Sequence, residues 1–218
     1  MALDRLSIWL PDQLSRAWLR EAVEVCGQPA DIELEDALQP RRPAASVGIV
    51  LICVAVTYWA AAHYADWWTI VCILPLVWGL LLLSVIDADH QLLPDILVLP
   101  LLWLGLIVNT TGLFASLESA VWGVALGYLA LWSIRAICQR ITGTQGIGLG
   151  DAKLLALIGA WGGWQILPAT LMLAVSISLI VTLPMVLMGR RDRKAPIAFG
   201  PYLAISGWGA LLYLPHWP

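Results

Sequence analysis

A succession of long apolar runs with almost no charge is the feature that most constrains this chain. The run from Trp67 to Ile86 covers twenty residues and contains no charged side chain. A helix needs about 20 apolar residues to cross the roughly 30 Å of hydrocarbon in a bilayer. Because lipid offers the backbone no hydrogen-bond partners, such segments must be helical. The sequence therefore predicts an all-α fold, a polytopic transmembrane helical bundle.

The composition agrees with this fold class. Of the 218 residues, 60% are hydrophobic and 12% are charged, whereas soluble domains are about 45–50% apolar and about 25% charged. Apolar segments follow one another from residue 46 onward, so residues 46–218 form the predicted transmembrane domain. About seven spans are expected, with six to eight as the range that the pattern allows. They lie near residues 46–64, 67–86, 96–114, 117–138, 152–164, 166–188 and 197–214.

Residues 1–45 form a separate block with eight acidic and five basic residues. Leu10, Leu14 and Trp18 recur at helical spacing, which predicts an amphipathic helix. The Pro- and acid-rich residues 28–43 are typical of a linker. An acidic helix of this kind is expected to pack on protein rather than on the membrane surface. The block is therefore predicted to be an N-terminal segment distinct from the transmembrane domain.

The basic residues predict the orientation of the chain in the membrane. If the N-terminus is cytoplasmic, the loops at 87–95, 139–151 and 189–196 are cytoplasmic too. These regions, with the N-terminal block and the adjoining helix ends, contain all twelve Lys and Arg residues, whereas the opposite loops contain none. Because positive charge collects on the cytoplasmic side of membrane proteins, the sequence predicts a cytoplasmic N-terminus.

Apart from the N-terminal block and Asp192, which lies within a basic run, four aspartates fall on the predicted cytoplasmic face: Asp87, Asp89, Asp95 and Asp151. Ionisable groups at membrane spans are costly, so each is a candidate for function. Asp87 directly follows an uncharged apolar run, where partial desolvation suits a carboxyl group for acid–base work. Asp89 is expected in a solvated loop, and Asp95, which follows Pro94, is expected to cap the next helix.

Asp151 follows three closely spaced glycines, Gly146, Gly148 and Gly150. Glycine lets the backbone turn tightly or approach another segment closely. A nucleotide-binding glycine loop is disfavoured because no strand precedes the glycines, no Gly-Lys-Ser/Thr follows, and the next helix is apolar. Lys153 is two residues beyond Asp151, so its side chain is expected to point away and reach toward the lipid headgroups.

Two carboxyl groups on separate helices at the same membrane depth indicate one class of reaction. If Asp87 and Asp151 meet, they share a proton, because two adjacent carboxylates do not both ionise readily. The ionised one can then take a proton from water while the protonated one polarises a peptide carbonyl. This chemistry needs no metal and no cofactor, and the sequence contains neither HExxH nor GxSxG. The residues favour an aspartyl protease, with a transporter or a structural membrane subunit as the alternative.

Three motifs, in order along the chain, resemble those of type IV prepilin peptidases. They are Asp87 with Pro94-Asp95 and the segment to Asn109, then Gly148-Leu-Gly-Asp151, then residues 197–204. The resemblance implies an endopeptidase of the bacterial inner membrane that removes the short basic leader of a prepilin or pseudopilin. By the same resemblance, cleavage follows a glycine and takes place at the cytoplasmic face.

The resemblance also assigns roles to residues of this chain. Asp87 and Asp151 would be the catalytic pair, with no metal and no cofactor. The residues expected to contact substrate or to support the site are Asp89, Pro94, Gly148, Gly150, Lys153, Gly200 and Pro201. The expected partners are the prepilin substrate, the lipid bilayer and components of a pilus or type II secretion assembly, with no nucleic acid.

The chain departs from the family in its N-terminal region. Many bacterial members carry two CxxC pairs there, in a domain associated with methylation of the new pilin N-terminus, whereas this chain has only Cys26. It resembles a short form without the tetracysteine domain, in which methylation is not expected. An intramembrane protease of the presenilin type is disfavoured because Asp87 lies at a span end. A non-catalytic membrane subunit or transporter of a pilus or secretion assembly is the remaining alternative.

Overall fold

The computed structural model describes residues 55, 57–58, 66–142, 148–189 and 198–213. The chain divides into two compact units, residues 1–65 and 66–218. The predicted amphipathic helix and linker of the first unit lie outside the described residues, as does nearly all of the predicted span at 46–64. The second unit contains the helices that position the candidate site.

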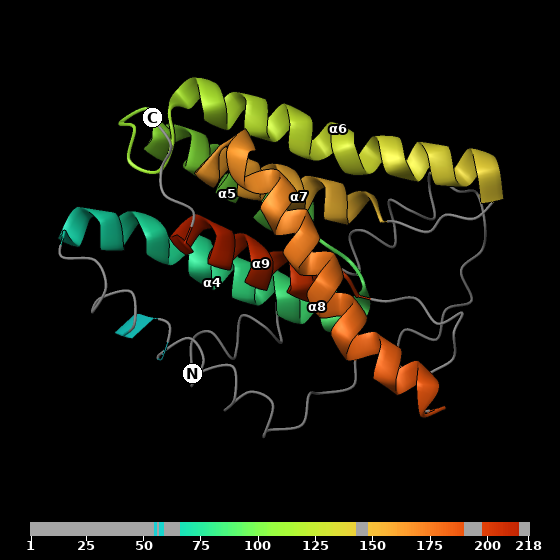
Figure 1. Cartoon of the computed structure of the whole chain (residues 1–218). Helices are drawn as coiled ribbons and strands as arrows, with labels where there is room; N and C mark the ends of the chain where they lie inside the picture. Colours follow the sequence, from blue (N-terminus) through green and yellow to red (C-terminus); the bar gives the residue numbers. More distant parts are fainter. Residues whose placement is uncertain (1–54, 56, 59–65, 143–147, 190–197, 214–218) are drawn as a thin grey trace, which may run out of the picture. The chain divides into compact units, whose positions relative to one another are not determined.

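Six α-helices and one short 3₁₀ turn make up the described part of the second unit (Figure 1). They are α4 (Trp67–His90), α5 (Asp95–Asn109), α6 (Leu117–Thr142), α7 (Leu149–Gly162), η1 (Trp164–Ile166), α8 (Leu167–Leu187) and α9 (Gly200–Tyr213). Each apolar run predicted from residue 67 onward overlaps one of these α-helices, although several helices extend beyond the predicted bounds. No strand occurs among the described residues, which confirms the all-α prediction.

Three helical segments are long and apolar enough to cross a membrane: Trp67–Asp89, Leu117–Ile141 and Trp164–Leu187. The helices α5, α7 and α9 have only 15, 14 and 14 residues, fewer than the roughly 20 that a span needs. The count of seven spans and the cytoplasmic N-terminus therefore stay predictions. Asp151 belongs to the short helix α7 and lies outside the three long segments.

The predicted end of the third span, at residue 114, is wrong because α5 ends at Asn109. The Asn109 side chain ends the helix: its carbonyl oxygen accepts hydrogen bonds from the backbone N–H groups of Phe114 and Ala115, both at 3.1 Å. Gly112 lies between Asn109 and Phe114 and has a φ of 71°, a conformation that glycine adopts at little cost. The turn after α5 therefore depends on Asn109 and Gly112, whereas the apolar residues around them made the sequence resemble a continuing helix.

Helix α7 lies in the interior of the bundle and packs against α5, α6 and α9. Ten of its fourteen residues are buried, including Asp151. Its contact with α6 is close: a Cβ added to Gly123 would lie 2.4 Å from the carbonyl oxygen of Gly159. Because both residues are glycines, the two helix backbones can approach this closely. Helix α7 is therefore held deep in the bundle and carries Asp151 with it.

Helices α5 and α7 are also joined by polar contacts. The Asn109 amide donates hydrogen bonds to the carbonyl oxygens of Ala160 and Trp161, both at 2.9 Å. The indole N–H of Trp161 donates to the carbonyl oxygen of Leu101 at 2.9 Å. The last residue of α5, Asn109, contacts the end of α7, and the first residue of α5, Asp95, contacts Lys153 in the first half of α7, so the two helices run in the same direction. Their N-terminal ends, near Asp87 and Asp151, therefore lie at the same end of the bundle.

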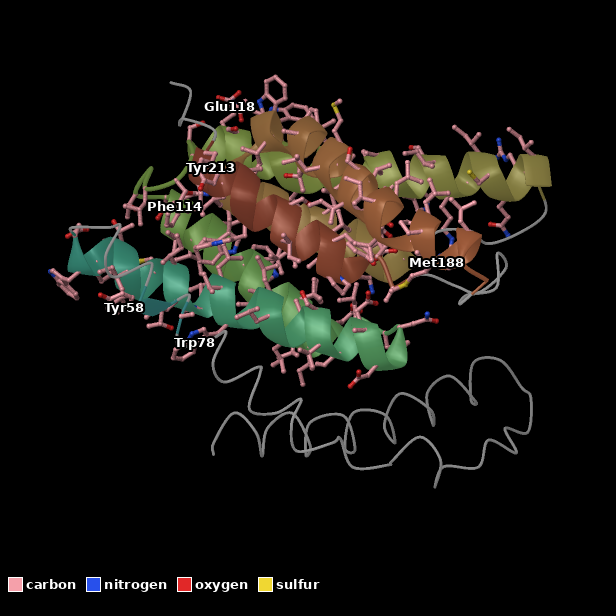
Figure 2. The ribbon with its side chains drawn as sticks, turned by 60° about the horizontal axis from the view of Figure 1, so that its bottom comes forward. Tyr58, Trp78, Phe114, Glu118, Met188 and Tyr213 are labelled. Carbon is pink, nitrogen blue, oxygen red and sulfur yellow. The ribbon has the colours of Figure 1, made fainter. Side chains whose placement is uncertain are left out.

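The two ends of the bundle can be followed from labelled side chains (Figure 2). Phe114 after α5, Glu118 at the start of α6 and Tyr213 at the end of α9 lie toward one end, whereas Met188 after α8 lies toward the other. Helix α9 packs against α4, α7 and α8. Its N-terminus therefore lies at the end of the bundle where α4 finishes and α7 begins.

Candidate active site

Asp87 lies in the last turn of α4 and is buried, with 5% of its surface exposed. Its carboxylate oxygen Oδ2 accepts a hydrogen bond from the backbone N–H of Gly200 at 2.8 Å. Gly200 is the first residue of α9, and the first N–H groups of a helix have no partner within the helix. Asp87 therefore occupies the N-terminus of α9, where a negative charge is favoured.

The position of Gly200 accepts no larger residue without movement. A Cβ added there would lie 2.6 Å from Oδ2 and 2.9 Å from Cγ of Asp87. The absence of a side chain lets the backbone of α9 approach the carboxylate closely enough to donate its N–H. This assigns a physical role to Gly200, which the sequence placed among the supporting residues.

Asp151 is the third residue of α7 and is also buried, at 9% exposure. Its carboxyl group accepts a hydrogen bond from the backbone N–H of Gly148, which is the N-cap residue of the same helix. A side chain at the third helical position that reaches back to the N-cap N–H forms half of a capping box. This bond orients the Asp151 side chain toward the start of its own helix.

The two carboxyl groups interact electrostatically. Burial, and then the negative charge of Asp87, raise the pKa of Asp151 to about 7, against an opposing hydrogen bond from Gly148. The two groups come from helices separated by more than fifty residues in sequence, and the close approach of Gly150, beside Asp151, to Leu93, in the turn after Asp87, brings the two segments together. Near neutral pH, the pair therefore readily holds one proton, as two carboxyl groups in a shared acid–base site do.

The sequence predicted that Lys153 reaches toward the lipid headgroups, but it does not. Its ammonium group contacts both carboxylate oxygens of Asp95, at 2.6 and 2.7 Å. Asp95 is correspondingly not an N-cap: Pro94 occupies that position, without a side-chain hydrogen bond, and Asp95 is the first helical residue of α5. Both predictions were wrong because they treated each side chain within its own helix, whereas the two meet across the α5–α7 contact.

The remaining supporting residues lie around this region in different settings. Asp89 is exposed as predicted, but the predicted loop around it is wrong, because α4 continues to His90. Gly148 is exposed, and Gly150 and Pro201 are half-buried. Pro94 is buried and contributes the backbone turn into α5. Among the residues that the structure describes, no three His, Cys, Asp or Glu side chains are grouped to hold a metal ion. Whether any of these side chains touches substrate stays a prediction.

Two features of the site were not found from the sequence. One is the N–H of Gly200 as the partner of Asp87, and the other is the Lys153–Asp95 ion pair. The signal for the first was Phe199-Gly-Pro201 ahead of an apolar helix, because glycine beside a helix start allows a close backbone approach. The second had no local signal, since the partners are 58 residues apart.

Fold and site together define a helical membrane protein with two buried, interacting carboxyl groups at one end of its bundle. The chain belongs to the type IV leader peptidase family, whose model matches residues 74–183. The matched region contains both Asp87 and Asp151 and ends before Gly200. No solved structure matches the chain.

Curated relatives named prepilin leader peptidase/N-methyltransferase agree with this family. The chain is 53% identical to that of Stutzerimonas stutzeri over 165 residues, covering 76% of this chain and 57% of the relative. It is 54% identical to that of Pseudomonas aeruginosa over 155 residues, covering 71% and 53%. A relative from Pseudomonas putida is 39% identical over 243 residues, covering 94% and 83%. The chain thus spans little more than half the length of the first two.

Proposed function

We propose that this protein is an aspartyl endopeptidase that removes the leader peptide from type IV prepilins or pseudopilins. The observation that carries the proposal is that Asp87 and Asp151 are both buried and lie on segments that contact each other at one end of the bundle. Family membership and the names of the relatives support the reaction class. Paired carboxyl groups hydrolyse peptide bonds by activating water directly, and they need no metal.

The surroundings of the two carboxyl groups support different roles for them. Asp87 accepts an N–H bond at the N-terminus of α9, and this bond favours its ionised form. Asp151, with its pKa raised to about 7 by burial and by Asp87, holds the shared proton. In the proposed step, Asp87 takes a proton from water as the water oxygen attacks the scissile carbonyl. Asp151 donates its hydrogen bond to the carbonyl oxygen as negative charge develops there.

Collapse of the tetrahedral intermediate then completes the reaction. The carbonyl re-forms, the carbon–nitrogen bond breaks, and the leaving amine takes the proton that Asp87 accepted from water. Asp151 keeps its proton as the carbonyl oxygen loses its negative charge, so the pair returns to its starting state. The products are the leader, with a new carboxyl terminus, and the mature pilin, with a new amino terminus.

The proposed substrate comes from the family resemblance, and the proposed side of the membrane comes from the placement of charge along the sequence. The predicted cytoplasmic loops, with the N-terminal block and the adjoining helix ends, contain all the basic residues, and the loops contain the two aspartates, so the proposed cut is at the cytoplasmic face of the inner membrane. The resemblance implies cleavage after a glycine at the end of a short basic leader. Docking onto pilus or secretion assembly components is part of the same proposal.

Methylation of the product is not part of the proposed function. The relatives' names include N-methyltransferase, but the chain lacks the paired CxxC motifs that the family associates with that activity. The alignment with the Pseudomonas putida relative covers 243 positions, more than the 218 residues of this chain. That relative therefore has residues with no counterpart here, which is compatible with a short form.

Co-expression with a prepilin tests the proposal. The wild-type chain should remove the leader, whereas Asp87→Asn and Asp151→Asn should each abolish removal while accumulating normally in the membrane. Glu118→Gln, an exposed change at the far end of the bundle, is the matched control. Asp89→Asn should give a smaller loss than either buried aspartate. Leader removal at the wild-type rate by either Asp87→Asn or Asp151→Asn would refute the paired mechanism.

The mass of the mature pilin tests the second part of the proposal. Pilin processed by this enzyme alone should carry a free amino terminus. A product heavier by one methyl group would show that methylation does not need the tetracysteine domain.

A further inference from the structure

The Lys153–Asp95 ion pair joins the two segments that carry the candidate catalytic residues. Lys153 Nζ lies 2.6 Å from Oδ1 and 2.7 Å from Oδ2 of Asp95. Lys153 is two residues beyond Asp151 on the same helix, and Asp95 follows Asp87 after the end of α4 and a short turn. Each member of the pair is therefore connected to one of the two carboxyl groups through a short stretch of backbone.

The turn between α4 and α5 lies directly against the start of α7. A Cβ added to Gly150 would lie 2.9 Å from Cβ and 3.0 Å from Cδ1 of Leu93. Leu93 belongs to the turn that follows Asp87, and Gly150 immediately precedes Asp151. The ion pair is therefore next to a close contact between the same two segments, and it joins the first turn of α5 to the start of α7.

Other contacts fix α5 on α7 farther from the acids. The Trp161 indole bonds to Leu101, and the Asn109 amide bonds to Ala160 and Trp161. These bonds hold the middle and the far end of α5, so their effect on the Asp87–Asp151 distance is indirect. The ion pair holds the first turn of α5, which is the part of that helix nearest to Asp87 in sequence.

The exposure of the pair indicates that its effect on stability is small. The two side chains are 30% and 29% exposed, and partly exposed ion pairs contribute little to the free energy of folding. Catalysis is more sensitive to position, because a displacement of about 1 Å can lower a rate by about 100-fold. A pair in this place therefore has more influence on the geometry of the two carboxyl groups than on folding.

We propose that Lys153 and Asp95 form a positioning pair for the active site, which sets the distance between the carboxyl groups of Asp87 and Asp151. The proposal rests on the proposed peptidase function and extends it to two residues that have no part in the proposed chemical step. Loss of either partner lets the α4–α5 turn shift on α7, so the two carboxyl groups no longer share a proton at the correct separation.

Kinetics of prepilin cleavage by the full-length protein in detergent micelles test the proposal. Lys153→Met and Asp95→Asn should each lower kcat by about 10-fold, with KM changed by less than about 2-fold. The double variant should lose no more than either single variant, because both changes break the same contact. Lys153→Arg, which can still reach the carboxylate, should keep most of the wild-type kcat. Arg140→Met, an exposed cation at the end of α6, is the matched control.

Melting temperatures of the same variants separate positioning from a structural role. All of them should melt within a few degrees of the wild type, because the pair is partly exposed. Three results would each overturn the proposal. They are an unchanged kcat in either single variant, losses of kcat that multiply in the double variant, and losses of kcat that follow a fall in melting temperature. If the wild-type protein itself does not cleave prepilin, the proposed peptidase function fails. Wild-type cleavage with no effect of the variants refutes only the positioning pair.

Discussion

Replacing Gly200 with alanine isolates the contact between α9 and Asp87. The new methyl group would lie 2.6 Å from Oδ2, 2.9 Å from Cγ and 3.0 Å from Cβ of Asp87. The first two distances are shorter than real Cβ contacts, so either the carboxylate or the start of α9 must move. Each movement breaks the 2.8 Å hydrogen bond from the Gly200 N–H, and Asp87 loses the donor that holds it.

The size of the effect follows from the bond that is lost. A hydrogen bond to a charged group contributes about 1.5–3 kcal/mol, and about 1.4 kcal/mol corresponds to a tenfold change in rate. If the bond orients Asp87 in the transition state, Gly200→Ala should lower kcat by about 10- to 100-fold. KM should change little, because Gly200 supports the base rather than the substrate.

Two other glycines of α9 provide matched controls. A Cβ on Gly209 would meet no atom within 4 Å, whereas a Cβ on Gly207 would lie 2.6 Å from the Ile158 side chain. Gly209→Ala should therefore keep kcat, and Gly207→Ala should lower the melting temperature without a comparable loss of kcat per folded molecule. The assay is prepilin cleavage by purified enzyme, normalised to folded protein. Equal kcat values for Gly200→Ala and Gly209→Ala would refute the reasoning.

Two further predictions concern protonation and packing. Burial and the charge of Asp87 raise the pKa of Asp151 to about 7, so the protonated acid is lost as pH rises through that value, and kcat should fall with it. A kcat that does not change across that pH would contradict the role of Asp151. Asn109→Ala removes four hydrogen bonds from a fully buried amide and should lower the free energy of unfolding by about 3 kcal/mol. The neighbouring exposed change Thr110→Ala should stay within about 0.5 kcal/mol in the same denaturation experiment, and equal effects of the two changes would contradict the role given to Asn109.

The helices could be predicted from the sequence because their cause is local. An uncharged apolar run such as Trp67–Ile86 must satisfy its backbone hydrogen bonds within itself in lipid, and α4 occupies that run. Helix ends depend on single side chains instead. Asn109 resembles any polar residue at the edge of an apolar run, and only its contacts with Phe114, Ala115 and α7 show why α5 ends there.

The candidate site shows the same difference between features with local causes and features that depend on distant residues. Charge placement predicted that Asp87 and Asp151 lie at one end of the bundle, and the parallel contact of α5 with α7 agrees with this. The side-chain partners were not predictable, because they come from distant parts of the chain. Lys153 is long enough to leave its own helix and reach Asp95, so spacing along α7 alone does not predict its direction. The identity of Asp87 and Asp151 as the catalytic pair stays a prediction until the variants are measured.

The hydrogen bond between Gly200 and Asp87 has a consequence for the order in which the protein is made. Its partners are 113 residues apart in sequence, and ribosomes add about 5–20 residues per second. A nascent chain therefore contains Asp87 for roughly 6 to 23 s before Gly200 has been synthesised. During that interval Asp151 is added and can meet Asp87, but the donor from α9 does not yet exist. The completed site thus depends on synthesis of α9, and an unfinished chain lacks the hydrogen bond that holds Asp87.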